Sequence, residues 1–352
     1  MVDGGRGWRF IRLVGLFGLL GILLSCSNPK EREIQEAFQA YKALFIDNGR
    51  IIDTGNGDVS HSEGQGYGLL FAVAANDRTA FDSIWMWTHT VLQRDDKLFH
   101  WRFRPCESKN KQCIDDPNNA SDGDILIAWA LLRAANKWGD KSYRHYAEAI
   151  ITAIEEKLFI ETEAYLVLLP GEFGFKSDEN NDEGIQLNLS YWVFPAIDAI
   201  TEISSRAVRW KALHRSGTAL IYKARFSKHK LPPDWLRVNE GALSLTNTVS
   251  QEYGFNACRI PLHLAWAGID DAAFYSDFER WWDIENTPAT VNLLTNEMTE
   301  YAMTPGMKAV ETAVKHIVDG SPLTLPVIDR NMDYYSASLT LLSMVAVMDA
   351  KS

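Results

Sequence analysis

The amino-acid sequence predicts an all-α protein in which helices, arranged as antiparallel pairs, close into a toroid. Eleven stretches place apolar residues at helical spacing, and most follow one another across short polar turns. Short turns favour antiparallel neighbours. Alternation typical of β-strands is confined to short segments between these stretches. About a dozen helices in such pairs predict a ring whose inner helices end at a cleft.

The helical stretches follow in order along the chain. Residues 34–45 open the series, four pairs with short turns follow, and a last pair has a longer connection. The pairs are 62–74 with 79–93, 122–137 with 142–157, 190–203 with 207–224, 255–267 with 271–283, and 305–318 with 334–348. No low-complexity linker interrupts them. We therefore expect one domain from about residue 31 to residue 352.

Composition narrows the class of protein. A hydrophobic share of 46% is ordinary for a globular chain, which argues against a disordered or a polytopic membrane protein. The net charge of −11 leaves no basic surface for nucleic acid, so we expect no such partner. Twelve tryptophans are a high count. Aromatic faces hold sugar rings in polysaccharide grooves, although most of these side chains are expected in the core.

The N-terminus has the features of an export signal. Three arginines precede an apolar run of twelve residues, 13–24, which is too short to span a bilayer comfortably. The run ends in Leu-Leu-Ser-Cys, which resembles a bacterial lipoprotein signal whose cysteine, here Cys26, is lipidated. We expect residues 1–26 to direct export. The mature protein would be a periplasmic or cell-surface lipoprotein that touches the membrane only through Cys26. Ordinary cleavage or an uncleaved anchor is the alternative.

The other cysteines suggest structural roles. Cys106 and Cys113 flank a short polar loop and could form a disulfide in an oxidising compartment. Cys258 lies among apolar residues and is predicted to be buried. No CxxC motif or His/Cys cluster is present, so the sequence predicts neither a metal site nor a cofactor.

Two segments combine acidic residues with glycines or a helix start. Glu63 lies beside three alternating glycines in residues 61–68, and Asp122 lies in residues 118–124, directly before an apolar helix. Both segments also match the capping-box pattern, as Ser60-x-x-Glu63 and Ser121-x-x-Asp124. On the pattern alone, each carboxylate could simply cap a helix.

The presence of two such carboxylates favours catalysis. Glycoside hydrolysis needs one carboxylic acid to protonate the leaving oxygen and one carboxylate to activate water or attack the sugar. In the first turn of a helix, the dipole favours Asp122 as a permanent anion. The same effect opposes a protonated Glu63, but we expect burial and the Asp122 anion to raise the pKa of Glu63 and to prevail.

Residues 120–138, ASDGDILIAWALLRAANKW, resemble the signature of glycoside hydrolase family 8, which contains bacterial cellulases, xylanases, lichenases and chitosanases. Residues 62–68 are similar to the family's acid segment. Residues 231–235, LPPDW, resemble a segment of the cellulases that accompany bacterial cellulose synthases. The resemblance covers essentially the whole chain after the signal segment and implies an (α/α)₆ barrel.

The resemblance also implies an activity. We expect an endo-acting, inverting hydrolase of β-1,4-linked glucan, whose partner is a polysaccharide substrate. Association with a cellulose or exopolysaccharide synthesis complex is a further expectation. Xylan, mixed-linkage glucan or chitosan remain alternative substrates.

Carried over by position, Glu63 matches the proton donor and Asp122 the aspartate that contacts the sugar at the cleavage site. Trp101, Tyr191 and Arg259 fall in segments that resemble the substrate groove and the surroundings of the cleavage site. The alternatives are core packing for the two aromatic residues and a structural ion pair for the arginine.

One position departs from the cellulase pattern. The general base there is the aspartate of Tyr-Asp-Ala-x-Arg-x-Pro, whereas this chain has Asn256 in the sequence GFNACRIP, residues 254–261. An amide has no site that takes a proton from water at neutral pH. Some branches of the family carry asparagine there and use a loop carboxylate instead.

Several carboxylates near this position are candidates for the missing base. They would have to lie about 6.5–9.5 Å from Glu63 for an inverting reaction. The alternative for the acidic loop is a solvated charge cluster. If no carboxylate serves, the chain would be a catalytically weak glycan-binding protein. The candidates are Asp178, Glu179, Asp182 and Glu183 of the loop 176–184, and Glu252.

Overall fold

The computed structural model describes residues 1, 2, 4, 29–106, 113–176 and 184–350. Cys26 and nearly all of the expected export signal lie outside this part of the chain. The described residues form eleven α-helices joined by loops and short strands. The all-α prediction is therefore confirmed.

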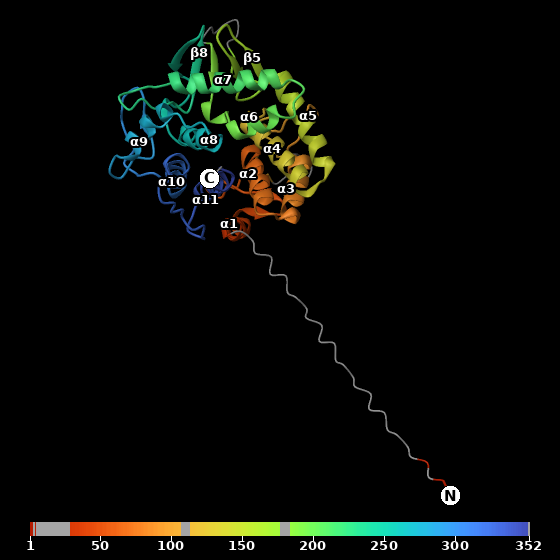
Figure 1. Ribbon diagram of the computed structural model, residues 1–352. Coiled ribbons are helices and arrows are strands. Elements are labelled where there is room, and N and C mark those ends of the chain that lie inside the picture. Colours follow the sequence, from red (N-terminus) through yellow and green to blue (C-terminus); the bar gives the residue numbers. More distant parts are fainter. Residues whose placement is uncertain (3, 5–28, 107–112, 177–183, 351–352) are drawn as a thin grey trace.

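The helices form two concentric rings, seen end-on in Figure 1. Within the described residues, six helices form the inner ring and five the outer ring. Successive inner helices contact one another, and α11 closes the ring against α2. The inner helices are α2 (Ser62–Ala74), α4 (Ser121–Trp138), α6 (Phe194–Thr201), α8 (Ile260–Trp266), α10 (Pro305–Asp319) and α11 (Tyr334–Asp349); the outer helices are α1 (Pro29–Phe45), α3 (Arg78–Val91), α5 (Lys141–Lys157), α7 (Ala207–Lys223) and α9 (Ser276–Trp282).

Side-chain pattern explains which helices lie inside. Helices α2 and α11 are apolar or small on all sides and almost entirely buried. The outer helices α3 and α5 bury one face only. Glycine allows the inner helices to approach closely, because a Cβ atom on Gly66 of α2 would lie 2.6 Å from the Cβ of Leu126 on α4. The sequence predicted most bounds within two residues.

Helices α6 and α8 begin later than predicted. Residues 190–203 and 255–267 each contain a 3₁₀ turn before the α-helix starts, at Leu189–Tyr191 and Ala257–Arg259 respectively. Each α-helix has a proline at its first or second position. Proline lacks an N–H donor and is tolerated only in the first turn, so each α-helix must begin close to its proline.

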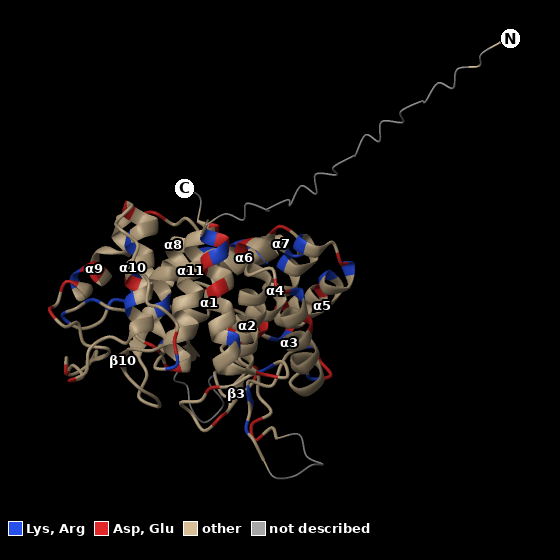
Figure 2. Ribbon diagram, turned by 90° about the horizontal axis from the view of Figure 1, so that it is seen from below, with Lys and Arg blue, Asp and Glu red and all other residues tan. Residues whose placement is uncertain are grey.

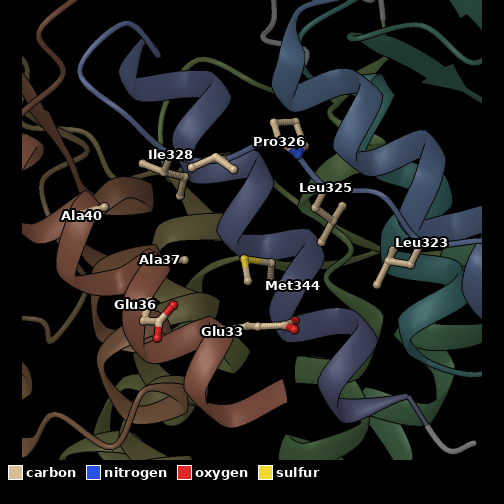
Figure 3. A pocket seen from close by; sticks show the side chains of 10 residues that line it. Glu33, Glu36, Ala37, Ala40, Leu323, Leu325, Pro326, Ile328 and Met344 are labelled. Carbon is tan, nitrogen blue, oxygen red and sulfur yellow. The ribbon is translucent and has the colours of Figure 1, made fainter. Parts of the chain in front are cut away.

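The last two helices do not form the antiparallel pair that was predicted. Gly306 at the start of α10 lies against Ser336 at the start of α11, so the two helices run parallel. The 320–333 connection returns the chain to the same end, along the outside of the barrel. A pocket of about 420 Å³ separates this connection from α1 and α11 (Figure 3). In extended form, a connection of this length can run along the whole of a helix, which is about 22 Å long.

The loops contain short antiparallel strands. Strand β3 (Ser60–His61) pairs with β4 (Arg102–Phe103). Strands β3 and β10 (Glu252–Tyr253) lie at the same end of the barrel (Figure 2). The remaining strands are β1 (Ile46–Asp47) with β2 (Arg50–Ile51), β5 (Phe159–Glu161) with β6 (Leu166–Leu168), β10 (Glu252–Tyr253) with β11 (Val291–Asn292), and the sheet β7 (Ile185–Leu187), β8 (Leu236–Asn239), β9 (Ala242–Leu245).

The structure confirms the predictions for Cys106, Cys113 and Cys258. Cys106 and Cys113 form a disulfide with their Cα atoms 5.7 Å apart. Cys258 is a free, buried thiol. Among the helices described, none combines the length and the apolar character needed to cross a membrane.

Candidate active site

The starts of four inner helices meet at one end of the barrel. Glu63 is the second residue of α2 and Asp122 the second residue of α4. Ser190 belongs to the 3₁₀ turn before α6, and Arg259 directly precedes α8. Because these helices are parallel, residues far apart in the sequence come together there.

Arg259 is the centre of this cluster. Its side chain is 4% exposed and forms an ion pair with Glu63. Its Nη1 atom lies 4.0 Å from Oδ2 of Asp122. The guanidinium also donates three hydrogen bonds to side chains, to the hydroxyl of Tyr67 at 2.8 Å, to Oγ of Ser190 at 3.0 Å and to Oδ1 of Asn256 at 3.0 Å, and a fourth to the backbone carbonyl of Asn256 at 3.4 Å. Arg259 thus forms an ion pair, as its structural alternative required, and the two carboxylates beside it belong to the predicted site residues Glu63 and Asp122.

Glu63 is the acidic side chain of this cluster that solvent reaches most readily. Its side chain is 29% exposed, compared with 4% for Asp122. The hydroxyl of Tyr67, one helical turn along α2, donates to Oε1 of Glu63 at 3.2 Å. The i, i+4 spacing puts both residues on one face, and this spacing could have identified Tyr67 from the sequence.

Neither acidic segment forms a capping box. The N-cap of α2 is His61 and that of α4 is Ala120, and neither makes a side-chain cap bond. Ser60 instead accepts a hydrogen bond from Nε of Arg50 at 2.8 Å. Asp124 accepts from the backbone N–H of Phe99 at 2.9 Å. The capping alternative is therefore wrong for both.

Asp122 differs from the permanent anion that was expected. Burial raises its pKa to about 7, although the N–H of Gly123 donates to Oδ1 at 2.8 Å and works against this shift. The desolvation of a fully buried carboxylate outweighs the favourable helix start. Asp122 is therefore harder to ionise than its position at a helix start alone would make it.

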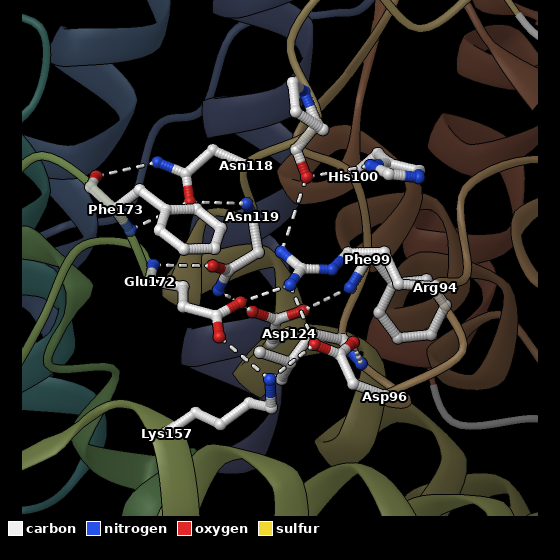
Figure 4. A network of polar contacts seen from close by, with 12 residues as sticks. Arg94, Asp96, Phe99, His100, Asn118, Asn119, Asp124, Lys157, Glu172 and Phe173 are labelled. Carbon is white, nitrogen blue, oxygen red and sulfur yellow. Dashed lines mark hydrogen bonds and ion pairs between the residues drawn. The ribbon is translucent and has the colours of Figure 1, made fainter.

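A polar network supports the start of α4 (Figure 4). Nδ2 of Asn119 donates to Oδ2 of the buried Asp124 at 2.6 Å, and Oδ1 of Asn119 accepts from the N–H of Glu172 at 2.8 Å. Glu172 pairs with Arg94, and Lys157 lies 2.8 Å from Oε1 of Glu172. This network links three loops to the start of α4 and so positions Asp122. The sequence analysis did not identify it.

Of the two predicted groove aromatics, Trp101 lies beside Ser62 and Tyr191 packs against the core. Trp101 is partly exposed and stacks on His61, with ring centroids 6.0 Å apart. Its indole N–H donates to Asp116 at 2.8 Å, and its carbonyl accepts from the N–H of Ser62, beside Glu63. Tyr191 is partly exposed, contacts Trp235 edge-on with ring centroids 6.4 Å apart, and packs against the hydrophobic core. Trp101 is therefore not a core residue, whereas the core alternative holds for Tyr191.

Asn256 lies in the cluster, and a buried aspartate lies behind it. Asp234 is 6% exposed, and its Oδ1 accepts from the backbone N–H groups of Gly254 at 3.0 Å, Asn256 at 3.2 Å and Ala257 at 2.7 Å. Burial raises its pKa to about 6. The resemblance of residues 231–235 was the only sign of this residue in the sequence.

Of the other candidates for the base, the structure describes Glu252. The backbone carbonyl of Glu252 accepts from the N–H of Asp234 at 2.6 Å, and the residue forms part of β10. The four loop carboxylates, Asp178, Glu179, Asp182 and Glu183, lie outside the described residues.

A barrel of paired helices, with two acidic side chains around a buried arginine where its inner helices begin, defines the class of an α/α-barrel glycoside hydrolase. A model of the family described as glycosyl hydrolases family 8 matches residues 12–349, and the chain belongs to this family.

Relatives agree over most of the chain. It is 37% identical over 327 residues to a probable endoglucanase of Novacetimonas hansenii, covering 91% of this chain and 92% of the relative. It is 38% identical over 295 residues to an endoglucanase of Cellulomonas uda, covering 82% and 79% respectively. The solved endo-β-1,4-glucanase CMCax from Acetobacter xylinum matches with a TM-score of 0.82 and 36% identity, over 91% of this chain and 99% of that one. These matches confirm the (α/α)₆ barrel.

Proposed function

We propose that this chain is an endo-acting hydrolase of β-1,4-linked glucan that inverts the anomeric centre. The observation that carries the proposal is the cluster of Glu63, Asp122 and Arg259 at the starts of three inner helices. The endoglucanase relatives support the substrate class. Residues 31–352 would form the catalytic domain.

Glu63 is proposed as the general acid. Its side chain is the more exposed of the two acidic side chains, so it is the one proposed to protonate the glycosidic oxygen. Its ion pair with Arg259 favours the carboxylate, so a protonated Glu63 requires that substrate loosen this contact. Asp122, as an anion, would stabilise the positive charge that develops on the sugar ring. Trp101 and Tyr191 are proposed to contact the substrate.

A product analysis tests this function. Purified protein is incubated with carboxymethyl cellulose, mixed-linkage glucan, xylan and chitosan, and viscosity is compared with the release of reducing ends. We expect a steep fall in viscosity with β-1,4-glucan and an α-anomeric first product by NMR. Preferred cleavage of xylan or chitosan would contradict the substrate, and a β-anomeric product would contradict inversion.

A glycan-binding protein with weak activity is the second candidate, and Asn256 is the observation that favours it. In that case cello-oligosaccharides would bind to wild type without being hydrolysed. Asn256→Asp would then create activity where there was little. A wild type that already turns over cellopentaose at ordinary rates contradicts this reading.

We also propose that residues 1–26 direct export and that Cys26 carries a lipid anchor. The Cys106–Cys113 disulfide supports an oxidising compartment. Cys26→Ser should release the protein from membranes or stall its processing, as followed by fractionation. An unlipidated mature wild type free in the periplasm would contradict the anchor. Association with a cellulose or exopolysaccharide synthesis complex is proposed on the resemblance of residues 231–235, and co-purification from membranes tests it.

A further inference from the structure

The inference concerns the missing base and rests on the proposed function. We propose that Asp234, acting through the side-chain amide of Asn256, accepts the proton of the attacking water. Asn256 would contact the water, and Asp234 would position the amide and receive its proton.

The amide of Asn256 is held from both sides in one orientation. Its Oδ1 accepts from Nη2 of Arg259 at 3.0 Å, so its Nδ2 points away from the guanidinium. The Asn256 side chain also lowers the pKa of Asp234 as a hydrogen-bond donor, a role that only its Nδ2 can fill. Asn256 is partly exposed, whereas Asp234 is buried. Asn256 is therefore the member of the pair that solvent reaches.

Asp234 is held as firmly as its partner. Three backbone N–H groups of residues 254–257 converge on its Oδ1. A Cβ atom on Gly254 would lie 3.1 Å from its Oδ2, so the loop fits closely around the carboxylate. The three donors favour the anion, while burial raises the pKa of Asp234 to about 6. The group is thus mostly ionised at pH 7 and can still accept a proton.

The groups around Asp234 do not compete for this role. Tyr191, Tyr253 and Tyr335 face it, and burial raises the pKa of each far above its usual value. Burial also raises the pKa of the Cys258 thiol to about 12. All four stay neutral near pH 7. The cation on this side is Arg259, which contacts Asn256 and uses one of the two lone pairs of Oδ1.

The proton transfers balance. The water oxygen forms a bond to the anomeric carbon while the bond to the leaving oxygen breaks, and Glu63 gives its proton to that oxygen. The water proton passes to Oδ1 of Asn256, and a proton passes from Nδ2 to Asp234. This leaves Asn256 as the imidic acid tautomer and Asp234 protonated. Return of the Asp234 proton to the nitrogen and loss of the Oδ1 proton to solvent restore both groups.

A double-mutant cycle tests the relay. Asp234→Asn keeps an oxygen for the three backbone donors but cannot accept a proton. With Asn256 present, we expect Asp234→Asn to lower kcat on cellopentaose by roughly 10²- to 10⁴-fold, with KM changed by less than about threefold. With Asn256→Asp, the carboxylate at the more exposed position 256 can act as the base itself, so the same change should cost less than about tenfold. Equal losses in both backgrounds would overturn the relay.

Azide separates the relay from a purely structural role, because it needs no base to attack. With β-cellobiosyl fluoride as substrate, Asp234→Asn should regain turnover in azide and yield α-cellobiosyl azide. Asp277→Asn is the matched control, since Asp277 is also buried but belongs to α9 in the outer ring. It should lose stability without losing kcat.

The outcomes also separate this inference from the proposed function. An active wild type whose Asp234→Asn variant keeps more than a tenth of kcat overturns the relay alone. Loss without azide rescue, together with a raised KM, also overturns it. Azide rescue in a variant of the 178–183 carboxylates, but not in Asp234→Asn, assigns the base to that loop. A wild type inactive on every glucan tested overturns the proposed function and the relay with it.

Discussion

Replacing Arg259 with methionine tests whether the site depends on one buried charge. Methionine keeps much of the hydrocarbon stem and removes the guanidinium. The change deletes the ion pair with Glu63 and the hydrogen bonds to Tyr67, Ser190 and Asn256. It also removes the cation that lies 4.0 Å from Asp122.

The expected loss of stability follows from burial. Removing one partner of a buried ion pair typically costs about 3–5 kcal/mol, because the remaining charge is left without compensation. Glu63 is 29% exposed and regains some solvation, so the lower end of this range applies. We expect the free energy of unfolding to fall by about 3 kcal/mol. Adding Glu63→Gln should recover part of this loss, because the stranded carboxylate is then gone.

Urea denaturation with linear extrapolation measures these changes. Arg144→Met is the control, since Arg144 and Glu148 form an exposed i, i+4 pair, which is expected to contribute about 0.3–0.5 kcal/mol. If Arg259→Met costs no more than this control, the guanidinium does not hold the acidic cluster together. Strict additivity with Glu63→Gln would likewise refute the coupling.

Three further variants probe the site. Glu63→Gln should lower hydrolysis of cellopentaose by roughly 10²- to 10⁴-fold but spare β-cellobiosyl fluoride, whose leaving group needs no acid; equal losses on both substrates would count against Glu63 as the acid. The pKa of Asp122 is raised from 3.8 to about 7, so the folded state binds this proton more tightly than the unfolded state does. Proton binding to Asp122 therefore stabilises the fold at low pH, and this stabilisation is lost as the pH rises through this window. Asp122→Asn should therefore lose less stability than wild type between pH 4 and 8 in urea titrations, besides losing activity. Gly123→Ala would put a Cβ atom against Ser62 and 2.8 Å from the backbone N of Glu63, so the free energy of unfolding should fall by about 1–3 kcal/mol and kcat should fall with it. Gly55→Ala should be neutral in both assays, because its Cβ atom would lie 3.5 Å from Oδ1 of Asp53, an ordinary van der Waals distance.

The sequence predicted the helices well and the path between two of them poorly. The pattern of apolar residues identified all eleven, because helices buried on one face or on all sides leave a local record in the sequence. It did not show that α10 and α11 run parallel, since the direction of a long extended connection leaves no such record. The late starts of α6 and α8 were readable in principle from Pro195 and Pro261.

The candidate site was predictable as a set of residues, not as a set of contacts. Motif resemblance identified Glu63, Asp122, Asn256 and Arg259, and the structure brings these four together. The sequence analysis gave capping, core packing and catalysis as competing roles. Only coordinates separate them, because the competing roles share the same local pattern and differ in what lies across the barrel.

The sequence by itself determined the short-range features of this protein. These are the helices, an acidic pair at two helix starts, and an amide where a base was expected. The tertiary structure alone decided the electrostatics. Burial raises the pKa of Asp122 to about 7. The fold places the carboxylate of Asp234 against the backbone N–H of Asn256, 22 positions away in the chain. Desolvation and charge pairing depend on distances between residues that are remote in sequence, and no local pattern records those distances.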